Sequence, residues 1–226
     1  MQIIFEDKAI LVINKPSGVL SIADGYDKTA PYLRSILEPE YGRLWIVHRL
    51  DKETSGVMIL AKSASSHRVL NQQFSEHLIE KQYAALAFGH CPDRFQNASS
   101  LRINGDRRHR TVVDLQKGKA ALTEFALVEY FDSGFSLISA FPKTGFSHQI
   151  RAHLLHLGYP ILGDHLYCTP DSECLSNNFK IGRVALHAYS VTFLHPETQK
   201  KTTFSADIPP DFSSWIDTFN KKRASV

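Results

Sequence analysis

Short apolar runs that end at turn residues recur along the chain. Ala9–Asn14 (AILVIN) stops at Lys15-Pro16-Ser17-Gly18, and Val57–Ala61 (VMILA) follows directly after Thr54-Ser55-Gly56. A third run, Gln82–Phe88 (QYAALAF), stops at Gly89. Runs of this length bounded by Gly, Pro and Ser are typical of buried strands. The pattern therefore predicts three strands in the first 90 residues.

Two pairs of apolar segments are joined by short turn sequences. The first connection contains Asp132-Ser133-Gly134, and the second is residues 195–199 (HPETQ). Segments of alternating or apolar character joined in this way indicate β-hairpins. The predicted strands are Thr123–Tyr130 and Phe135–Phe141 in the first hairpin, and Val184–Leu194 and Lys201–Phe204 in the second.

Three segments have helical character. Ser63 is a good N-cap for a helix whose apolar face carries Val69, Leu70, Phe74 and Leu78. Residues 147–157 (SHQIRAHLLHL) predict a second helix, with Ser147 near its start and Gly158 as its C-cap. Pro209–Lys221 predicts a closing helix.

Strands outnumber helices, and several strands are linked by hairpins. This order favours an α+β fold with a mixed, mostly antiparallel central sheet and flanking helices. The sequence contains no repeat, low-complexity tract or long linker. We therefore expect residues 1–226 to form a single domain.

The composition of the chain limits the cellular compartments and the kinds of metal site or cross-link that we expect. No apolar run approaches the ~20 residues of a membrane span, and the N-terminus lacks the basic start and apolar stretch of a secretory signal. The three cysteines, Cys91, Cys168 and Cys174, are odd in number and form no CxxC pair, which argues against a disulfide framework and a structural zinc site. We expect a cytoplasmic protein.

The net charge of +3 is weak evidence for a nucleic-acid partner, but its distribution is uneven. Residues 102–119 (RINGDRRHRTVVDLQKGK) contain six Lys or Arg and two Asp, a local excess of four positive charges. This segment, which includes Arg107, Arg108 and Arg110, predicts a basic loop or hairpin able to contact phosphates. The alternative is a solvated surface loop.

The densest polar cluster is His48–Gly56 (HRLDKETSG). It joins the apolar segment that ends at Val47 to the strand predicted at Val57, so a rigid scaffold holds it on both sides. Reactive groups are commonly carried by such loops. On this evidence alone, Asp51 is either a reactive carboxylate or a turn residue that caps the amide of Glu53 or Thr54.

HRLDKETSG resembles the signature of the RluA-type pseudouridine synthases, which modify ribosomal and transfer RNA. Four other segments resemble motifs of that family and occur in the family order. These are NKPSG (residues 14–18), EKQYAAL (80–86), TGFSHQIRAHLLHLGYPILGD (144–164) and LHAYSVTFLHP (186–196). Five ordered motifs cover nearly the whole chain, in a form without the N-terminal RNA-binding module that many relatives carry.

The resemblance implies three catalytic residues. Asp51 is then the nucleophile, an ionised carboxylate that attacks either the sugar or the uracil ring and later leaves. Arg151 is implied to pair with that carboxylate, keeping it charged and oriented. Tyr83 is implied to pack on the uracil and to accept the proton lost from carbon 5. Without the motifs, Arg151 would be interpreted as a surface ion-pair residue and Tyr83 as a core aromatic.

Two further expectations concern RNA. The resemblance implies that Arg49 fills the space left when the target base is flipped out of its stack, offsetting part of a cost of a few kcal/mol. Phe146 stands where the family usually has an arginine, which changes a contact relevant to RNA affinity or substrate choice. Without an accessory module, we expect RNA to be held by the catalytic domain and the basic segment around Arg107, Arg108 and Arg110.

The expected activity is isomerisation of specific uridines in structured ribosomal or transfer RNA, with no cofactor, no metal, no membrane and no obligatory protein partner, by a monomer. Two alternatives remain open. One is a catalytically silent RNA-binding or ribosome-assembly factor on the same scaffold. The other is a metal-dependent phosphodiesterase that uses Asp51 and nearby histidines; His148 and His153, however, are five residues apart rather than at the i, i+4 spacing of helical ligands.

Overall fold

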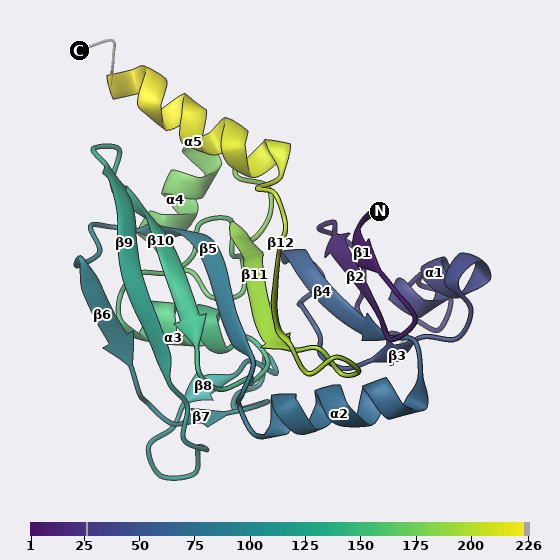
Figure 1. The fold of residues 1–226 in the computed structure, drawn as a ribbon. Coiled ribbons are helices and arrows are strands. Elements are labelled where there is room, and N and C mark those ends of the chain that lie inside the picture. The colour runs from purple at the N-terminus through teal and green to yellow at the C-terminus, as the bar shows by residue number, and fades with distance from the viewer. Residues whose placement is uncertain (26, 224–226) are drawn as a thin grey trace. The chain divides into compact units, whose positions relative to one another are not determined.

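The computed structural model describes residues 1–25 and 27–223. The chain packs as two compact units: unit 1 is Met1–Lys81 with Ala188–Asp207, and unit 2 is Gln82–His187 with the segment that starts at Ile208 (Figure 1). The chain passes from one unit to the other within strands β5 (Glu80–Phe88) and β11 (Leu186–Leu194). The positions of the two units relative to one another are not determined, so the single domain expected for residues 1–226 stays a prediction.

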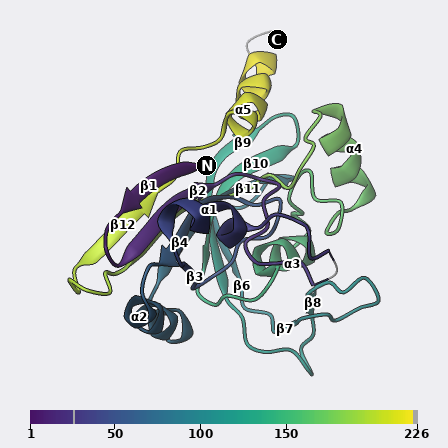
Figure 2. The ribbon, with the colours of Figure 1, turned by 90° about the vertical axis from the view of Figure 1, so that its right-hand side faces the viewer.

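Unit 1 is built on a sheet that contains antiparallel pairs of neighbouring strands. Strand β2 (Ile10–Lys15) lies between β1 (Gln2–Glu6) and β4 (Ser55–Ala61). Strand β11 follows β4 in the sheet and pairs with β12 (Lys201–Ser205), as the predicted second hairpin requires. Figure 2 shows β12 beside β1, where the rings of Phe5 and Phe204 lie 5.0 Å apart.

The strands predicted at residues 9–14 and 57–61 are confirmed as β2 and β4. Ile10, Leu11, Val12 and Ile13 are all fully buried, and every residue of β4 is buried. Strands covered on both faces carry continuous apolar runs instead of an alternating pattern. That explains why these two segments could be recognised by their apolar character alone.

Two helices accompany this sheet. Helix α2 (Ala64–Ser75) packs against β4 and the short strand β3 (Trp45–Ile46), and the Ser66 amide donates to Ser63 Oγ as the predicted cap requires. The helix ends at Ser75, so the expected place of Leu78 on its apolar face was wrong; Leu78 is 56% exposed. Helix α1 (Leu33–Tyr41) was not anticipated from the sequence.

Gly56, the second residue of β4, has a backbone conformation that other residues rarely adopt, with φ at +120°. A Cβ at this position would lie 2.2 Å from the main-chain oxygen of Ala188 in β11. Positive φ and close approach of two backbones both favour glycine. The spacing of β4 and β11 in unit 1 therefore depends on this residue.

Unit 2 contains a second run of antiparallel strands, in the order β5, β10 (Phe135–Pro142), β9 (Thr123–Phe131) and β6 (Arg94–Asn97) (Figure 1). The predicted hairpin between β9 and β10 is confirmed, with Phe131 opposite Phe135. Gly134 in its turn has φ at +92°. A two-stranded hairpin, β7 (Leu101–Arg102) with β8 (Val112–Val113), lies within the basic segment.

Helix α3 (Gln149–His156) packs against β9 and β10, where Ile150 and Leu154 join the apolar core of unit 2. Its predicted ends were one or two residues off. His148, with φ at 56°, is the N-cap in place of Ser147, and Leu157 precedes Gly158 as the C-cap. Because His148 has a positive φ, it is not itself helical, and the helix begins at Gln149, one residue later than a cap at Ser147 would give.

Two further helices complete unit 2: α4 (Pro170–Asn178) and α5 (Pro210–Arg223), the latter close to the predicted closing helix. Phe212 and Phe219 of α5 are buried in the same apolar core as α3. The fold is α+β with a mixed sheet, as expected. Cys91, Cys168 and Cys174 are free thiols, and none of the described helices is long and apolar enough to cross a membrane.

Candidate active site

Asp51 lies in a tight turn between the segment that ends at Leu50 and strand β4. The Thr54 amide donates to the main-chain carbonyl of Asp51, 3.1 Å away, and this bond closes the turn. The amide of Thr54 thus takes part in a main-chain hydrogen bond that holds the shape of the turn. The residues that follow, Thr54 and Ser55, are buried and fix the turn to β4.

The motif at residues 14–18 holds the turn from the other side through the buried Lys15. The side chain of Lys15 is fully buried, and its Nζ donates to the carbonyls of Pro16, Val19 and Lys52 at 2.9–3.1 Å. A buried ammonium needs acceptors, and three carbonyl dipoles supply them. Lys15 therefore joins the loop that follows β2 to the residue directly after Asp51.

Four more hydrogen bonds join the same two segments. Ser17 Oγ donates to the carbonyl of Glu53 at 2.7 Å, and the Gly18 amide donates to that of Lys52 at 2.8 Å. Ser21 Oγ both donates to the carbonyl of Leu50 and accepts from its amide. The turn that carries Asp51 is thus fixed on both sides of the aspartate, as a reacting group requires.

His48 has a structural role in the same unit. Its Nε2 accepts from the Ile59 amide at 2.9 Å, and its ring stacks on Phe74 with 4.7 Å between centroids. Burial, with a smaller contribution from the positive charge of Lys81, lowers the pKa of His48 to about 3. The imidazole is therefore neutral at pH 7 and anchors the start of the motif to β4.

Arg151, on α3 in unit 2, is 7% exposed. Its Nε and Nη2 donate to the two oxygens of Asp164 at 2.6 and 2.9 Å. The same carboxylate accepts the amides of Leu166 and Tyr167 at 2.9 and 2.8 Å. Bidentate contact with a fixed carboxylate orients the guanidinium plane.

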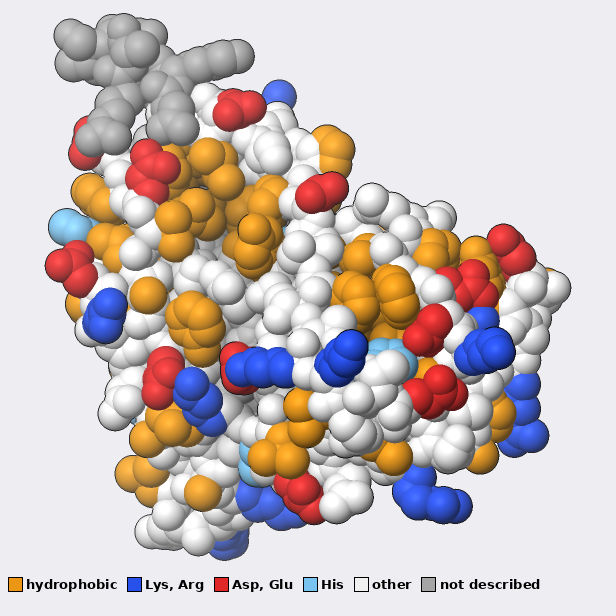
Figure 3. All heavy atoms as spheres, viewed as in Figure 1, with side chains coloured by type: hydrophobic (Ala, Val, Ile, Leu, Met, Phe, Trp, Pro, Cys, Tyr) orange, Lys and Arg blue, Asp and Glu red, His pale blue; other side chains and the backbone are white. Residues whose placement is uncertain are grey.

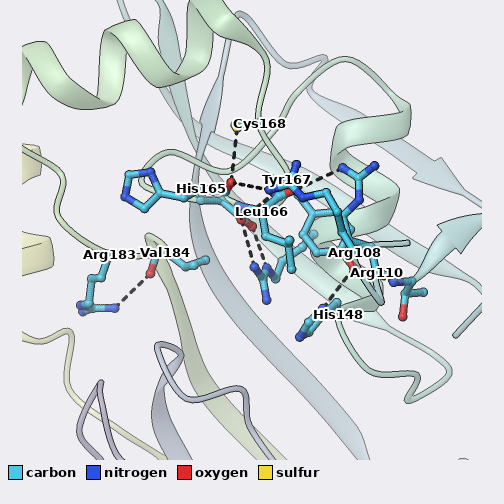
Figure 4. A network of polar contacts seen from close by, with 12 residues as sticks. Arg108, Arg110, His148, His165, Leu166, Tyr167, Cys168, Arg183 and Val184 are labelled. Atoms are coloured by element: carbon cyan, nitrogen blue, oxygen red, sulfur yellow. Dashed lines mark hydrogen bonds and ion pairs between the residues drawn. The ribbon is translucent and has the colours of Figure 1, made fainter. Parts of the chain in front are cut away.

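Tyr167 extends this network (Figure 4). Its ring lies 4.8 Å from the guanidinium carbon of Arg151, and its hydroxyl accepts the Thr111 amide at 2.7 Å and lies 3.1 Å from His148 Nδ1. Burial raises the pKa of Tyr167 to about 12, so the phenol keeps its proton and can donate to His148. Asp164 and Tyr167 were not assigned roles from the sequence, because nothing in it signals that they contact Arg151.

Tyr83 lies on β5, opposite Ala140 of β10, and packs against the apolar core of unit 2 while remaining partly exposed. A ring with one face on a core and one part in solvent can stack on a base. Phe146, at the position where the family usually has an arginine, packs on an apolar cluster formed by Leu101, Ala121, Ala152 and Tyr167. Position 146 therefore makes apolar packing contacts with a cluster that includes Leu101 of strand β7 in the basic hairpin.

The three arginines of the basic segment differ in their contacts. Arg110 Nε donates to Asp106 at 2.6 Å, and its Nη1 donates to the carbonyl of Leu166 at 3.2 Å (Figure 4). Arg108 Nη2 donates to the carbonyl of His165 at 3.4 Å, and Arg107 is exposed. The hairpin thus contacts the 164–167 turn that also orients Arg151. Hydrogen bonds from the amide and the side chain of Arg110 lower the pKa of Asp106.

Charged side chains of both signs occur on the surface. On the face shown in Figure 3, acidic and basic side chains are interspersed among the residues drawn in colour. Arg49, directly before Leu50 in unit 1, is exposed.

The histidines considered as metal ligands have other partners. His153, which is fully buried, lies 2.8 Å from Thr123 Oγ1 and 3.1 Å from the carbonyl of Ser99. Because a carbonyl only accepts, Nε2 carries the proton and the ring fills a structural position. No group of three or more His, Cys, Asp or Glu among the described residues is arranged to hold a metal ion.

The predicted site residues therefore fall into two groups. Asp51 and Arg49 belong to unit 1, and Tyr83, Arg151, Arg107, Arg108 and Arg110 belong to unit 2. Within unit 2, the network around Asp164 and Tyr167 links Arg151 with Arg108 and Arg110. The pairing expected between Asp51 and Arg151 stays a prediction.

Comparisons with known proteins agree with the motifs. Residues 9–156 match the family model described as RNA pseudouridylate synthase. The chain is 39% identical over 223 residues to ribosomal large subunit pseudouridine synthase C of Buchnera aphidicola subsp. Acyrthosiphon pisum (strain APS), covering 96% of this chain and 70% of that protein. It is 36% identical over 212 residues to the dual-specificity RNA pseudouridine synthase RluA of Escherichia coli (strain K12), covering 93% of each.

A solved structure shares the fold. The human RNA pseudouridylate synthase domain containing 1 superposes with a TM-score of 0.78 at 22% identity, covering 100% of this chain and 95% of that one.

Proposed function

The chain belongs to the RNA pseudouridylate synthase family, and on that premise we propose that it converts specific uridines of structured ribosomal or transfer RNA into pseudouridine, with Asp51 as the nucleophile. The observation that carries the proposal is the turn of Asp51, whose neighbours on both sides are hydrogen-bonded to residues 15–21. Such fixation is what a carboxylate needs in order to attack repeatedly from one direction.

The proposed reaction transfers the bond between base and sugar from N1 to carbon 5 of the same uracil, and it needs no electron donor. The Asp51 carboxylate attacks a carbon of the target nucleotide, the bond between uracil N1 and the sugar breaks, and the ring turns. The bond to Asp51 then breaks and regenerates the carboxylate, and a bond forms between the sugar and carbon 5, whose proton is removed while N1 gains one. Atoms and electrons balance within the nucleotide, so the proposal includes no cofactor or metal.

Arg151 and Tyr83 are proposed to serve the same uridine. Arg151 would keep the Asp51 carboxylate ionised and oriented, and the fixed plane of its guanidinium, held by Asp164, supports that role. Tyr83 would pack on the uracil and accept the proton from carbon 5; its partly exposed ring supports that role. Units 1 and 2 would thus act as one catalytic domain.

RNA recognition is proposed to rest on two sets of arginines. Arg49 would occupy the space of the flipped base, and Arg107, Arg108 and Arg110 would contact phosphates. The names of the relatives, one acting on the ribosomal large subunit and one of dual specificity, support ribosomal or transfer RNA as the substrate class. We propose that the chain works as a monomer in the cytoplasm, where such RNA is processed.

The test compares the wild-type protein with Asp51→Asn on total ribosomal and transfer RNA from a strain lacking the gene. Wild type should introduce pseudouridine at one or a few positions, and Asp51→Asn should bind the same RNA without modifying it. Turnover by Asp51→Asn above a no-enzyme control would remove Asp51 from the mechanism. RNA binding by wild type with no pseudouridine formed would favour the alternative, a silent RNA-binding or assembly factor.

A further inference from the structure

A hollow of about 340 Å³ lies in unit 1, apart from the turn of Asp51 in sequence. It is lined by Ile22, Ala23, Tyr32, Arg34, Trp45, Ile46 and His67. These residues come from the loop after β2, from the start of α1, from β3 and from α2 (Figure 1). None of them has a role in the reaction proposed above.

The hollow is open and mostly apolar. Ile22 is 39% exposed, and Tyr32, Trp45 and His67 are only partly buried, so their rings are available from solvent. Leaving apolar surface in water costs about 25 cal/mol per Å² relative to burying it. An apolar concavity of this kind is characteristic of ligand sites.

Its walls are tied together by hydrogen bonds. The Leu33 amide donates to the carbonyl of Leu20 at 2.9 Å, which joins the start of α1 to the loop after β2. The Glu38 carboxylate accepts both Arg34 Nε at 2.7 Å and the Leu44 amide at 3.0 Å, which joins α1 to the residue before β3. Because these bonds fix the lining in advance, an occupant would lose little to ordering of the protein.

Aromatic rings and guanidinium planes occur together here. Arg34 lines the hollow, and the guanidinium carbon of Arg43 lies 4.9 Å from the centre of the Trp45 ring. Unpaired RNA bases stack on aromatic rings and on arginine planes. Arg34 forms an ion pair with Glu38, so the positive charge that attracts the phosphates of the RNA is that of Arg43. The volume is at the lower end of the roughly 300–1,000 Å³ range of ligand pockets, which suits one nucleotide better than an extended peptide.

We propose that this hollow binds an unpaired base of the substrate RNA, next to Tyr32 and Trp45, at a distance along the strand from the uridine that is modified. The inference rests on the proposed function, because it takes the occupant to be the RNA of the reaction. It assigns to unit 1 a binding subsite that contributes affinity and substrate choice but no chemistry.

The first experiment uses the fluorescence of Trp45. The chain has two tryptophans, so Trp215→Phe leaves Trp45 as the only reporter. Titration with the enzyme's stem-loop RNA should quench Trp45 in a saturable way, with a midpoint close to the KM for modification. No quenching at RNA concentrations that saturate turnover would overturn the proposal. Quenching by uridine monophosphate at lower concentration than by RNA would also overturn it, since the hollow would then take a free nucleotide.

The second experiment uses substitutions in the lining. Stacking of one base on an aromatic ring contributes about 1–3 kcal/mol, so Tyr32→Ala should raise the KM for RNA by roughly 5- to 150-fold with kcat unchanged, and Tyr32→Phe should restore it. Tyr189→Ala, which removes a 40% exposed tyrosine of β11, is the matched control and should leave the KM unchanged. A Tyr32→Ala enzyme with wild-type KM would refute the subsite.

Arg43→Gln keeps the test decisive if Tyr32→Ala fails to fold, because Arg43 is an exposed side chain. It should also raise the KM and weaken the quenching; wild-type values for both would count against the subsite. The two proposals fail differently. RNA-dependent quenching of Trp45 without pseudouridine formation would refute the proposed reaction but not the subsite. Pseudouridine formation with a wild-type KM in the Tyr32 and Arg43 variants would refute the subsite but not the reaction.

Discussion

Arg151 and Asp164 meet through two parallel hydrogen bonds of 2.6 and 2.9 Å, and their side chains are 8% and 0% exposed. Arg183 and Asp211 have the same geometry at the same two distances, and the Arg183 side chain is 11% exposed, but the Asp211 side chain is 45% exposed. The chain thus contains two ion pairs that differ mainly in burial. Breaking a buried pair leaves an uncompensated charge out of water, which an exposed pair avoids.

Asp164→Asn should therefore destabilise the protein by about 3–5 kcal/mol. Asp211→Asn should cost less, because water reaches the Asp211 carboxylate. Asp164→Asn should also lower kcat more than it changes the KM, because Arg151 loses its orientation. Urea denaturation and single-turnover rates measure both effects. Equal losses of stability in the two variants would contradict the role of burial.

Lys15→Met should loosen the turn of Asp51. It removes hydrogen bonds to the carbonyls of Pro16, Val19 and Lys52, each worth about 1.5–3 kcal/mol when the donor is charged. We expect lower stability, reduced kcat and faster amide exchange at Gly18 and Thr54. Lys201→Met, which removes a 64% exposed lysine paired with Glu80, should change none of these. Wild-type kcat in Lys15→Met would show that the turn holds its shape without the lysine.

Substitutions of the three arginines in the basic segment should have different effects, because the arginines make different contacts. Replacing Arg107, Arg108 and Arg110 together should make the salt dependence of RNA binding shallower by up to about two units on a log–log scale. Arg110→Gln alone should also lower stability, because it breaks the contacts with Asp106 and Leu166. Arg49→Ala should bind RNA normally and turn over slowly. Measurements of affinity at several salt concentrations decide the matter: an unchanged slope in the triple variant would make residues 102–119 a solvated loop.

Acid should destabilise the protein through His48. The folded ring has a pKa near 3 against 6.5 for the unfolded chain, so between these values the unfolded state binds a proton that the folded state does not. The contribution of the neutral ring to the free energy of unfolding is complete above pH 6.5. It falls as the pH drops toward 3, by at most about 1.4 kcal/mol per pH unit. His48→Gln should flatten the profile between pH 4.5 and 6.5, and His67→Gln should not. Identical profiles for wild type and His48→Gln would refute this.

Modification should proceed without any metal. Protein treated with EDTA and returned to buffer is expected to modify its RNA at the untreated rate, because the proposed reaction uses a carboxylate and no Lewis acid. The control adds Mg²⁺ to both samples, so that RNA folding is the same. A loss of activity that one particular transition metal restores would favour the phosphodiesterase alternative.

The elements that the sequence predicted well are those whose signal is local. Val57–Ala61 is apolar throughout because β4 is covered on both faces, and the hairpin at Gly134 needs a residue with positive φ. Leu78 continued the apolar spacing of α2 by chance. The chain reverses at His77, with φ at 57°, and that reversal leaves Leu78 exposed.

The network around Arg151 depends on contacts that no local pattern encodes. Asp164 is 13 residues from Arg151, and Thr111 is 56 residues from Tyr167. The same holds for Lys15 and Lys52, 37 residues apart. The sequence predicted which motifs carry the chemistry, and that stays a prediction. The side chains that hold these motifs in place could be identified only from the folded chain.

Gly56 closes the HRLDKETSG motif and lies five residues after Asp51, yet its Cβ would meet the backbone of Ala188 rather than any substrate. We therefore expect Asp51 and Gly56 to tolerate substitution to different degrees. In a saturation library scored for solubility alone, position 56 should reject nearly every residue while position 51 accepts many. Within one motif, the proposed reaction would fix the identity of Asp51, whereas the distance between two strands fixes that of Gly56.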